Sequence, residues 1–385
     1  MAKALRVCYF GTYRSEYARN QVLIEGLRRA GAEVLICHEP LWHSIEDRIQ
    51  VASGGWYRPG FWLRVFRTYW RLIRKYRTIG SYDILVVGYP GQYDVFLARL
   101  LCWFSKKPLV WDVLNSMYLI MTERGIAQAH RLTAGIVRRL EQAALRLPDL
   151  LFLDTDVFIE WFHTTYRISA NHFRVIPICI DKDELPDALT KAGDQVAKDP
   201  QQLSILYYGT FIPNHGVDVI IEAAHLLRDD PEITFCLIGD GPDKQKALEL
   251  AESYNLKNVD FIDWLEKPAL ALKITSADIC LGGFGDTLQA SLTFNNKVYE
   301  AFSLKKPVIT GKSPAIPSSL IHREHLYLCE RGSPASLAES IRTLRDDPTL
   351  CSRLGDNGYA ILTNQFDLLP VGKLFYTYLA ALARP

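Results

Sequence analysis

Short apolar runs that alternate with helix-like segments constrain the fold of this chain most. The first run, Ala4 to Phe10, is followed by a glycine, a polar turn and a helix predicted from about Glu16 to Arg29. The same order returns at Ser204 to Tyr208, before a long loop and a helix predicted over Val217 to Leu227. Repeated strand, turn and helix units are typical of doubly wound α/β domains with parallel sheets. We therefore predict two such domains in the 385 residues.

A polar, proline-flanked stretch separates the two sets of units. Asp181 to Gln202 has no sustained apolar period, so we predict an interdomain linker at residues 181–202, with room for a short helix. The first domain is then expected over residues 1–180 and the second over residues 203–366. A final helix is expected within residues 367–385.

The composition favours a globular protein without a nucleic-acid partner. Charged residues make up 23% of the chain and the net charge is only +1, so no global affinity for polyanions follows. No apolar run approaches the ~20 residues that span a bilayer, and no signal peptide is evident at the N-terminus, which predicts a cytoplasmic protein. The eight cysteines are scattered without a CxxC pair, which argues against disulfides and against a zinc site.

The stretch from Gly282 to Gly311 looks built to hold a charged ligand. It offers Asn295 or Asn296 as the N-cap of a helix, whose free N–H groups can receive a phosphate. Lys297 adds a positive charge in the first turn. Glu300 follows on the same face, where a carboxylate can accept hydrogen bonds from two sugar hydroxyls. Phosphate and ribose together predict a nucleotide, and the alternative is an ordinary connection in a parallel sheet.

Several motifs carry a resemblance to a known family. Lys297 to Ala301 and Lys306 to Ile309 resemble the second half of the donor-nucleotide segment in retaining glycosyltransferases of family four, which have the GT-B fold and belong to the glycosyl transferases group 1. Gly239 to Pro242 is similar to a glycine turn of that family. Phe173 to Ile178 resembles the segment that ends its first domain. The resemblance covers most of the chain in the order of its elements.

The resemblance implies both a fold and an activity. Two doubly wound, Rossmann-like domains would face each other across a cleft, with the acceptor on the first and the nucleotide-sugar on the second. The helix of residues 367–385 would cross back to the first domain. The family transfers a hexose from a nucleotide-sugar with retention of configuration and needs no cofactor or divalent metal, so none is expected here.

The chain departs from the family pattern at two places. Leu292 stands where the first glutamate of a pair is expected, and Asp286 is the nearest acid, offered only as a weak substitute. The loop of residues 209–216 carries Thr210 and His215 where the family usually has an arginine and a lysine. Positive charge for the donor diphosphate would then depend on the lysine of the helix start.

Three sets of candidate residues follow from these motifs and from the ends of the predicted strands. The catalytic candidates are Lys297, Asp112 and Glu300. The donor-binding candidates are Gly209, Thr210, His215, Gly239, Gly241, Asp286, Asn296, Lys297 and Glu300. The acceptor-side candidates are Gly11, Thr12 and Asn115. For Asp112 the alternative is that it only caps or orders the loop after its strand.

The stretch from Trp56 to Ile79 has seven basic residues, eight aromatic residues and no acid. As a helix it would have a basic arc and a wider, aromatic-rich arc, which suits an anionic membrane surface. The candidates for that surface are Trp62, Arg64, Arg67, Trp70, Arg71, Arg74 and Lys75. The alternatives are a helix that packs on the sheet with solvated arginines, or a mixture in which a tryptophan edge stays exposed.

The predicted partners are a nucleotide-sugar donor and an acceptor that is a saccharide, a lipid-linked sugar or a surface-glycan precursor. A basic aromatic helix favours a lipid-linked acceptor and a position on the cytoplasmic face of the membrane. Two other functions stay open. A nucleotide-sugar 2-epimerase shares the architecture, and a non-catalytic glycosyltransferase-like subunit would account for Leu292 and the missing loop cations.

Overall fold

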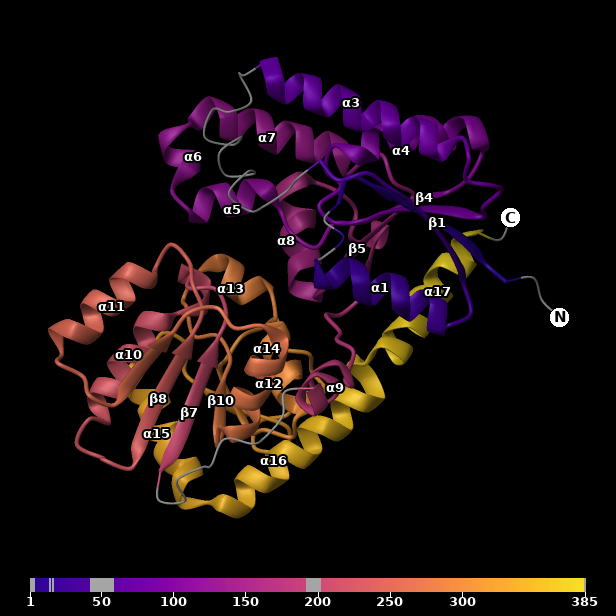
Figure 1. Ribbon diagram of the computed structural model, residues 1–385. Coiled ribbons are helices and arrows are strands. Elements are labelled where there is room, and N and C mark those ends of the chain that lie inside the picture. Colours follow the sequence, from indigo (N-terminus) through magenta and orange to yellow (C-terminus); the bar gives the residue numbers. More distant parts are fainter. Residues whose placement is uncertain (1–3, 14, 16, 42–58, 192–201, 384–385) are drawn as a thin grey trace. The chain divides into compact units, whose positions relative to one another are not determined.

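The computed structural model describes residues 4–13, 15, 17–41, 59–191 and 202–383. The chain forms two compact units (Figure 1). Unit 1 contains residues 1–177 and 368–385, and unit 2 contains residues 178–367. Both units are doubly wound α/β domains with a six-stranded sheet, as the repeated strand and helix units predict.

The sheet of unit 1 is parallel throughout, in the order β2-β1-β3-β4-β5-β6. Its strands are β1 (Arg6–Gly11), β2 (Glu33–His38), β3 (Ile84–Val87), β4 (Leu109–Asp112), β5 (Leu150–Leu153) and β6 (Phe173–Val175). Strands β3, β4 and β5 are buried along their whole length. Because helices cover both faces of a parallel sheet, such strands are continuous apolar runs without alternation.

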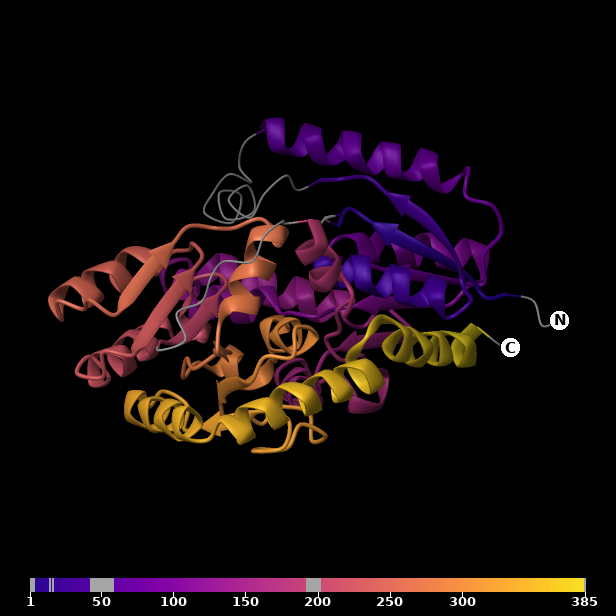
Figure 2. The same cartoon turned by 60° about the horizontal axis from the view of Figure 1, so that its bottom comes forward.

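Helices form a layer on each side of this sheet (Figure 2). The helices of unit 1 are α1 (Ala18–Arg29), α3 (Pro59–Tyr76), α4 (Asp94–Ser105), α5 (Met117–Glu123), α6 (Ile126–Ala129), α7 (Arg131–Ala144), α8 (Asp156–Tyr166) and α17 (Leu368–Ala383), with a short 3-10 turn η2 (Ala170–His172). The C-terminal helix α17 packs on α1, as the resemblance implies. Two glycines allow this contact, since a Cβ atom on Gly372 would lie 2.1 Å from the carbonyl oxygen of Gly26.

The sheet of unit 2 has the order β12-β11-β10-β7-β8-β9 and is also parallel. Its strands are β7 (Leu203–Tyr208), β8 (Ile233–Ile238), β9 (Val259–Ile262), β10 (Ile279–Leu281), β11 (Val308–Gly311) and β12 (Tyr327–Cys329). Its helices are α9 (Glu184–Lys191), η3 (Pro213–His215), α10 (Val217–Leu226), α11 (Lys244–Ser253), α12 (Lys267–Ser276), α13 (Leu288–Leu292), α14 (Asn296–Ser303), α15 (Pro334–Asp346), α16 (Pro348–Ile361) and η4 (Leu362–Phe366).

The core of unit 2 has two layers, one on each face of the sheet. Ile205 and Tyr207 of β7 pack in one layer, and their neighbours Leu206 and Tyr208 pack in the other. Because successive side chains of a strand point to opposite faces, β7 is buried on both sides. The strand thereby fixes the loop that follows it.

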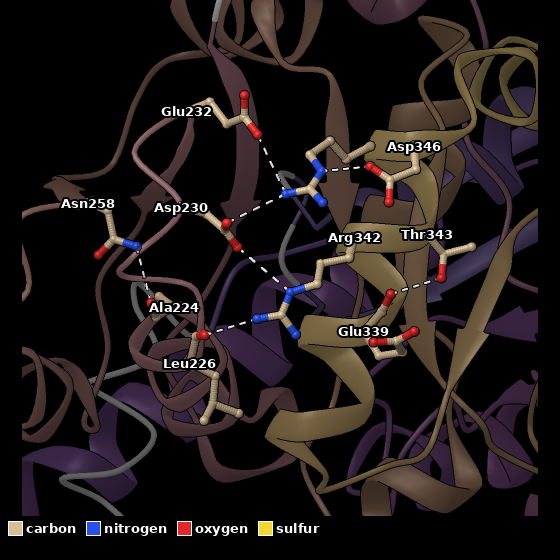
Figure 3. Close-up of polar contacts among 10 residues, drawn as sticks. Ala224, Leu226, Asp230, Glu232, Asn258, Glu339, Arg342, Thr343 and Asp346 are labelled. Carbon is tan, nitrogen blue, oxygen red and sulfur yellow. Dashed lines mark hydrogen bonds and ion pairs between the residues drawn. The ribbon is translucent and has the colours of Figure 1, made fainter.

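Charged side chains near the start of β8 tie helix α15 to the rest of unit 2 (Figure 3). Arg342 donates to the carbonyl oxygen of Leu226 at 3.1 Å and lies 3.7 Å from Asp230. Arg345 lies 3.7 Å from Asp230 and 3.5 Å from Glu232. These pairs are partly exposed, so each contributes about 1 kcal/mol or less. They lie at the end of the sheet where β8 begins.

The structure revises one expected boundary. Residues 178–191 belong to unit 2, because Leu185 and Ala188 of α9 are buried with Ala271 of α12. The remainder of the predicted linker lies mostly outside the described residues. Within the described part of the chain, no helix combines the length and the apolar character that crossing a bilayer requires.

Candidate functional site

The carboxyl ends of β7, β8 and β10 form the candidate site of unit 2. The chain runs from β7 to β8 and β9 in one direction along the sheet and from β10 to β11 and β12 in the other. The point between β7 and β10 is thus a topological switch point, where ligands of doubly wound sheets bind. Predicted donor residues from three separate loops lie at this edge.

Glycines bring the loops after β7 and β8 into direct contact. Gly209, Gly239 and Gly241 have φ angles of 138°, 145° and 150°, which residues with a side chain rarely adopt. A Cβ atom on Gly239 would lie 2.0 Å from the carbonyl oxygen of Gly209. One on Gly241 would lie 2.5 Å from the carbonyl oxygen of Phe211. These three predicted residues therefore shape the backbone of the site, which only glycine allows.

Lys297 reaches into this edge from the first turn of α14. Its side chain is only 7% exposed, and its Nζ atom lies 4.0 Å from the centre of the Tyr207 ring. A Cβ atom on Gly209 would be 2.9 Å from the same Nζ atom. Within the described residues, the buried Nζ atom has no hydrogen-bond partner. The side chain thus presents a nearly enclosed ammonium group beside the end of β7.

Burial makes this ammonium group costly. Removal from water lowers the pKa of Lys297 to about 7, and the negative charge of Glu300 opposes the shift only in part. A buried charge is normally paired or neutralised, because leaving it alone costs several kcal/mol. The Tyr207 ring supplies a cation–π contact of about 1–2 kcal/mol. An anion bound at this edge would restore the full charge.

The start of α14 differs in one detail from the prediction. Asn295 occupies the N-cap position, but its side chain accepts no capping hydrogen bond from the helix. Its Nδ2 atom lies instead near Gly283, where a Cβ atom would be only 2.5 Å away. Asn296 is the first residue of the helix, and its buried Oδ1 atom has no hydrogen-bond partner in the described structure. The side chain of Asn295 therefore does not cap the free N–H groups at the start of α14.

Glu300 lies one helical turn beyond Lys297 and is half-buried. Burial raises the pKa of Glu300, while the Lys297 ammonium and the hydroxyl of Tyr208 pull that pKa down. The same Tyr208 hydroxyl donates to the carbonyl oxygen of Lys297 at 2.8 Å, which holds the first turn of α14 on β7. The structure thus places Lys297 and Glu300 on one face, as their spacing predicts.

His215 is a neutral member of the site. Its Nδ1 atom lies 2.6 Å from the carbonyl oxygen of Thr210 and 3.1 Å from the Tyr207 hydroxyl. Burial and the nearby Lys297 charge lower the pKa of His215 to about 3. Because a carbonyl can only accept, Nδ1 carries the proton and Nε2 is an acceptor. His215 therefore does not replace the missing loop cation, and its free nitrogen suits a hydroxyl rather than a phosphate oxygen.

The acidic substitute and the missing glutamate lie on a separate short segment. Asp286 is exposed between β10 and α13, and its neighbours are Gly332 and Arg331. Leu292, at the end of α13, is buried. A buried apolar side chain thus occupies the position at which the resemblance implies a glutamate.

The predicted acceptor-side residues of unit 1 are engaged in internal contacts. Asp112 is fully buried, and its two oxygens accept from Arg19 at 2.8 and 3.0 Å. Arg19 also donates to the carbonyl oxygen of Ile176 at 2.9 Å. The expected direct contact of Asp112 with a sugar therefore gives way to the alternative, in which Asp112 orders the end of its strand.

Gly11 and Thr12 contact a residue that the sequence analysis missed. Asp94, at the start of α4, accepts from the Thr12 backbone N–H at 2.7 Å and from its hydroxyl at 3.0 Å. A Cβ atom on Gly11 would lie 2.7 Å from Asp94 Oδ2. Asn115 is partly exposed, and its carbonyl oxygen accepts from Gln92 at 3.4 Å. Asp94 is 82 residues beyond Thr12 in the sequence, so no local pattern could have linked the two residues.

A second missed residue is Asp154, at the end of β5. Both of its carboxyl oxygens are buried without a hydrogen-bond partner in the described structure. Burial raises the pKa of Asp154 to about 7, against the opposing charge of Arg19. Its neighbour Thr155 caps α8 by accepting from the Phe158 N–H at 3.2 Å.

Helix α3 shows the mixed arrangement that the sequence left open. It packs through Thr68 and Leu72, while the side chains of Trp62, Phe66 and Trp70 are exposed. Of the predicted basic residues, Arg67, Arg71, Arg74 and Lys75 are exposed and Arg64 is half-buried. Basic and aromatic side chains of α3 are therefore both exposed, which corresponds to the mixture with an exposed tryptophan edge.

No group of three or more His, Cys, Asp or Glu side chains in the described ranges is arranged to hold a metal ion. His322 and His325 are three residues apart, but each ring nitrogen Nδ1 accepts a hydrogen bond from the backbone. His322 Nδ1 accepts from the Leu328 N–H at 2.9 Å and His325 Nδ1 from the Ile321 N–H at 3.2 Å, so each ring closes its own turn.

Two family models match the chain over most of its length. The model described as Glycosyltransferase Family 4 matches residues 20–184, and the model described as Glycosyl transferases group 1 matches residues 190–361. The chain is 26% identical over 162 residues to the lipopolysaccharide core biosynthesis glycosyltransferase LpsD of Rhizobium meliloti (strain 1021). That match spans 41% of this chain and 43% of the relative, which is less than half of either.

Solved structures match over nearly the whole chain. HepE of Anabaena in complex with UDP-glucose has a TM-score of 0.67 at 15% identity, covering 98% of this chain and 100% of that one. WaaG, a glycosyltransferase involved in lipopolysaccharide biosynthesis, has a TM-score of 0.65 at 16% identity, covering 97% and 99%. At such identities the likeness concerns the fold.

Proposed function

Because the chain belongs to the glycosyl transferases group 1, which have the GT-B fold, we propose that it moves a sugar from a nucleotide-sugar to an acceptor hydroxyl with retention of configuration. The proposed reaction is that of a hexosyltransferase that uses no divalent metal. The donor would lie at the carboxyl ends of β7, β8 and β10. HepE, a neighbour in fold, has been crystallised with UDP-glucose, so a UDP-sugar is the first donor to test.

The observation that carries this proposal is the buried Nζ atom of Lys297, which has no hydrogen-bond partner among the described residues. A buried ammonium group without a hydrogen-bond partner is stable only at a cost, which a bound diphosphate would offset. Of the predicted donor-site side chains, Lys297 alone carries positive charge, since His215 is neutral. As the sugar–phosphate bond breaks, negative charge grows on the leaving diphosphate. A preorganised cation at that point lowers the barrier by about 3 kcal/mol.

Other side chains at this edge suit the hydroxyl groups of the donor. Glu300 can accept hydrogen bonds from the ribose, which is the role its spacing from Lys297 predicts. His215 Nε2 and Asn296 Oδ1 are further acceptors, and each is suited to a hydroxyl donor. We propose that these acceptors orient the nucleotide-sugar while Lys297 neutralises its diphosphate.

We further propose that the acceptor is a lipid-linked sugar or a surface-glycan precursor. Support comes from the names of LpsD and WaaG, which concern lipopolysaccharide biosynthesis. The basic, aromatic outer side of α3 in unit 1 agrees with an acceptor presented at a membrane. In this proposal the enzyme acts as a peripheral protein at the cytoplasmic face.

Ligand-induced thermal stabilisation tests the donor proposal. With UDP-, GDP-, ADP- and TDP-sugars in turn, one nucleotide class at 100 times its Kd should stabilise the protein by about 2.7 kcal/mol. Lys297→Ala should abolish this shift and lower kcat roughly 10²- to 10³-fold. Lys305→Ala is the matched control, because Lys305 follows the same helix but is exposed beside Asp356. Equal donor binding and turnover in Lys297→Ala would refute the proposal.

A further inference from the structure

The outer side of three helices in unit 1 is unusually apolar. Helices α3, α4 and α7 lie on one side of the sheet, because the chain moves in one direction along the sheet from β2 through β3 and β4 to β5 (Figure 1). We define their exposed residues as the three-helix face. Its large apolar side chains are Trp62, Leu63, Phe66 and Trp70 of α3, Phe96, Leu100, Trp103 and Phe104 of α4, and Leu132, Ile136 and Leu140 of α7.

This face holds eleven of the eighteen large hydrophobic side chains that are exposed in the described structure. Several are almost fully in solvent, including Leu132 at 87%, Phe104 at 77%, Trp103 at 75% and Phe66 at 69%. Monomeric proteins rarely leave so many large apolar groups together at the surface. The face therefore indicates a contact that the isolated chain does not make.

Hydrogen bonds and packing hold the three helices as one surface. Tyr69 of α3 donates to Asp94 at the start of α4 at 2.7 Å. Tyr82 bridges the far ends of both helices, lying 2.7 Å from the Tyr76 hydroxyl and 3.0 Å from the Ser105 hydroxyl. Tyr93, before α4, and Leu140 of α7 line one small hollow. The exposed residues are thus fixed on a common layer.

The charge of the face has a single sign. Helix α3 has no acidic residue, α4 has only Asp94 and α7 has only Glu141, and both of these carboxylates are buried. Exposed basic residues come from all three segments: Arg67, Arg71, Arg74 and Lys75 of α3, Lys106 after α4, and Arg131, Arg138 and Arg139 of α7. The whole chain has a net charge of only +1, so the excess of positive charge is a property of this face and not of the protein in general. The partner must be both apolar and negatively charged.

We propose that the three-helix face seats unit 1 on an anionic lipid bilayer, with Trp103, Phe104, Leu132 and Ile136 entering the headgroup boundary beside the aromatic residues of α3. Tryptophan and phenylalanine favour that boundary, and arginine and lysine pair with acidic headgroups. A second copy of this chain fits less well, because two like-charged faces would repel each other. The inference deepens the proposed function by naming the surface on which a lipid-linked acceptor is met.

Vesicle sedimentation tests the contact without any catalysis. The full chain should sediment with phosphatidylglycerol-containing vesicles, should stay in solution with pure phosphatidylcholine vesicles, and should bind less at 0.5 M salt. Trp103→Glu with Phe104→Glu should lower the bound fraction at least about tenfold. Leu132→Glu with Ile136→Glu should act in the same direction, although α7 lies far from α3 in sequence. Unchanged sedimentation of both double variants would overturn the proposal.

Two controls separate this result from other causes. Leu248→Glu replaces an exposed leucine of unit 2 and should leave vesicle binding unchanged, as should the donor-site variant Lys297→Ala. All variants except Lys297→Ala change exposed residues. Melting temperatures check that every variant folds. Light scattering gives the oligomeric state of the chain. If the wild type is dimeric, the variant with Trp103→Glu and Phe104→Glu is monomeric, and no vesicles bind, then a second copy occupies the face and the bilayer proposal fails.

Discussion

A single residue, Lys297, links the stability of unit 2 to its proposed activity. Its ammonium group is buried beside Tyr207 without a hydrogen bond in the described structure. Lys297→Met keeps the volume but removes the charge, so we expect the free energy of unfolding to rise by about 1–4 kcal/mol while transfer is lost. Urea denaturation of both proteins at pH 6 measures the first effect. A destabilised Lys297→Met protein would contradict the argument.

The same residue gives this difference a pH dependence. The pKa of Lys297 is about 7 in the folded protein and 10.5 in a free lysine. Between these values the unfolded chain binds more protons, so the wild type gains stability as the pH rises from 7 to 10. The advantage of Lys297→Met should therefore be greatest below pH 7 and disappear near pH 10. Denaturation midpoints across this range measure it.

Donor binding should take up a proton above neutral pH. A bound diphosphate favours the charged lysine, so the pKa rises on binding and the affinity falls up to tenfold for each pH unit above about 7. Calorimetry at pH 8 in buffers of different ionisation enthalpy should record nearly one proton taken up per donor. Lys297→Arg, which is always charged, is the control and should record none. No uptake by the wild type would place the diphosphate elsewhere.

At the scale of elements, helix α17 depends on two glycines for its contact with α1. A Cβ atom on Gly372 would meet the Gly26 carbonyl oxygen at 2.1 Å, so Gly372→Val must separate the helices. We expect a loss of about 1–3 kcal/mol and a lower melting temperature. Gly135→Val in α7 is the matched control, because a Cβ atom there meets nothing within 4 Å. Equal melting temperatures for both variants would show that the close contact is not needed.

Elements also show how far local pattern carries a prediction. The spacing of Lys297 and Glu300 predicted that they share a face, because three residues are nearly one helical turn. The apolar run from Ser204 to Tyr208 predicted β7 to within one residue. For α3 and α4 the same patterns could not say which apolar side chains the sheet would cover. Trp103 and Phe104 lie in a run that looks like a core helix, yet they are exposed.

At the scale of the whole molecule, contacts between distant residues lay beyond the sequence. Arg19 pairs with Asp112 across 93 positions, and Asp94 bonds Thr12 across 82. Such pairs depend on the order of the strands, which a single sequence does not contain. The fold class was nevertheless predictable, since repeated strand and helix units admit few arrangements. The boundary at residue 178 was not, because the burial of α9 on α12 is a tertiary contact.

The division of the chain has a consequence for its synthesis. Unit 2 is one continuous segment, residues 178–367, whereas unit 1 needs both residues 1–177 and the helix α17 that follows unit 2. On the ribosome, unit 2 can therefore complete its core while unit 1 still waits for its last helix. During that interval α1 lacks its packing partner, and nascent unit 1 is the part of the chain that chaperones would have to shield.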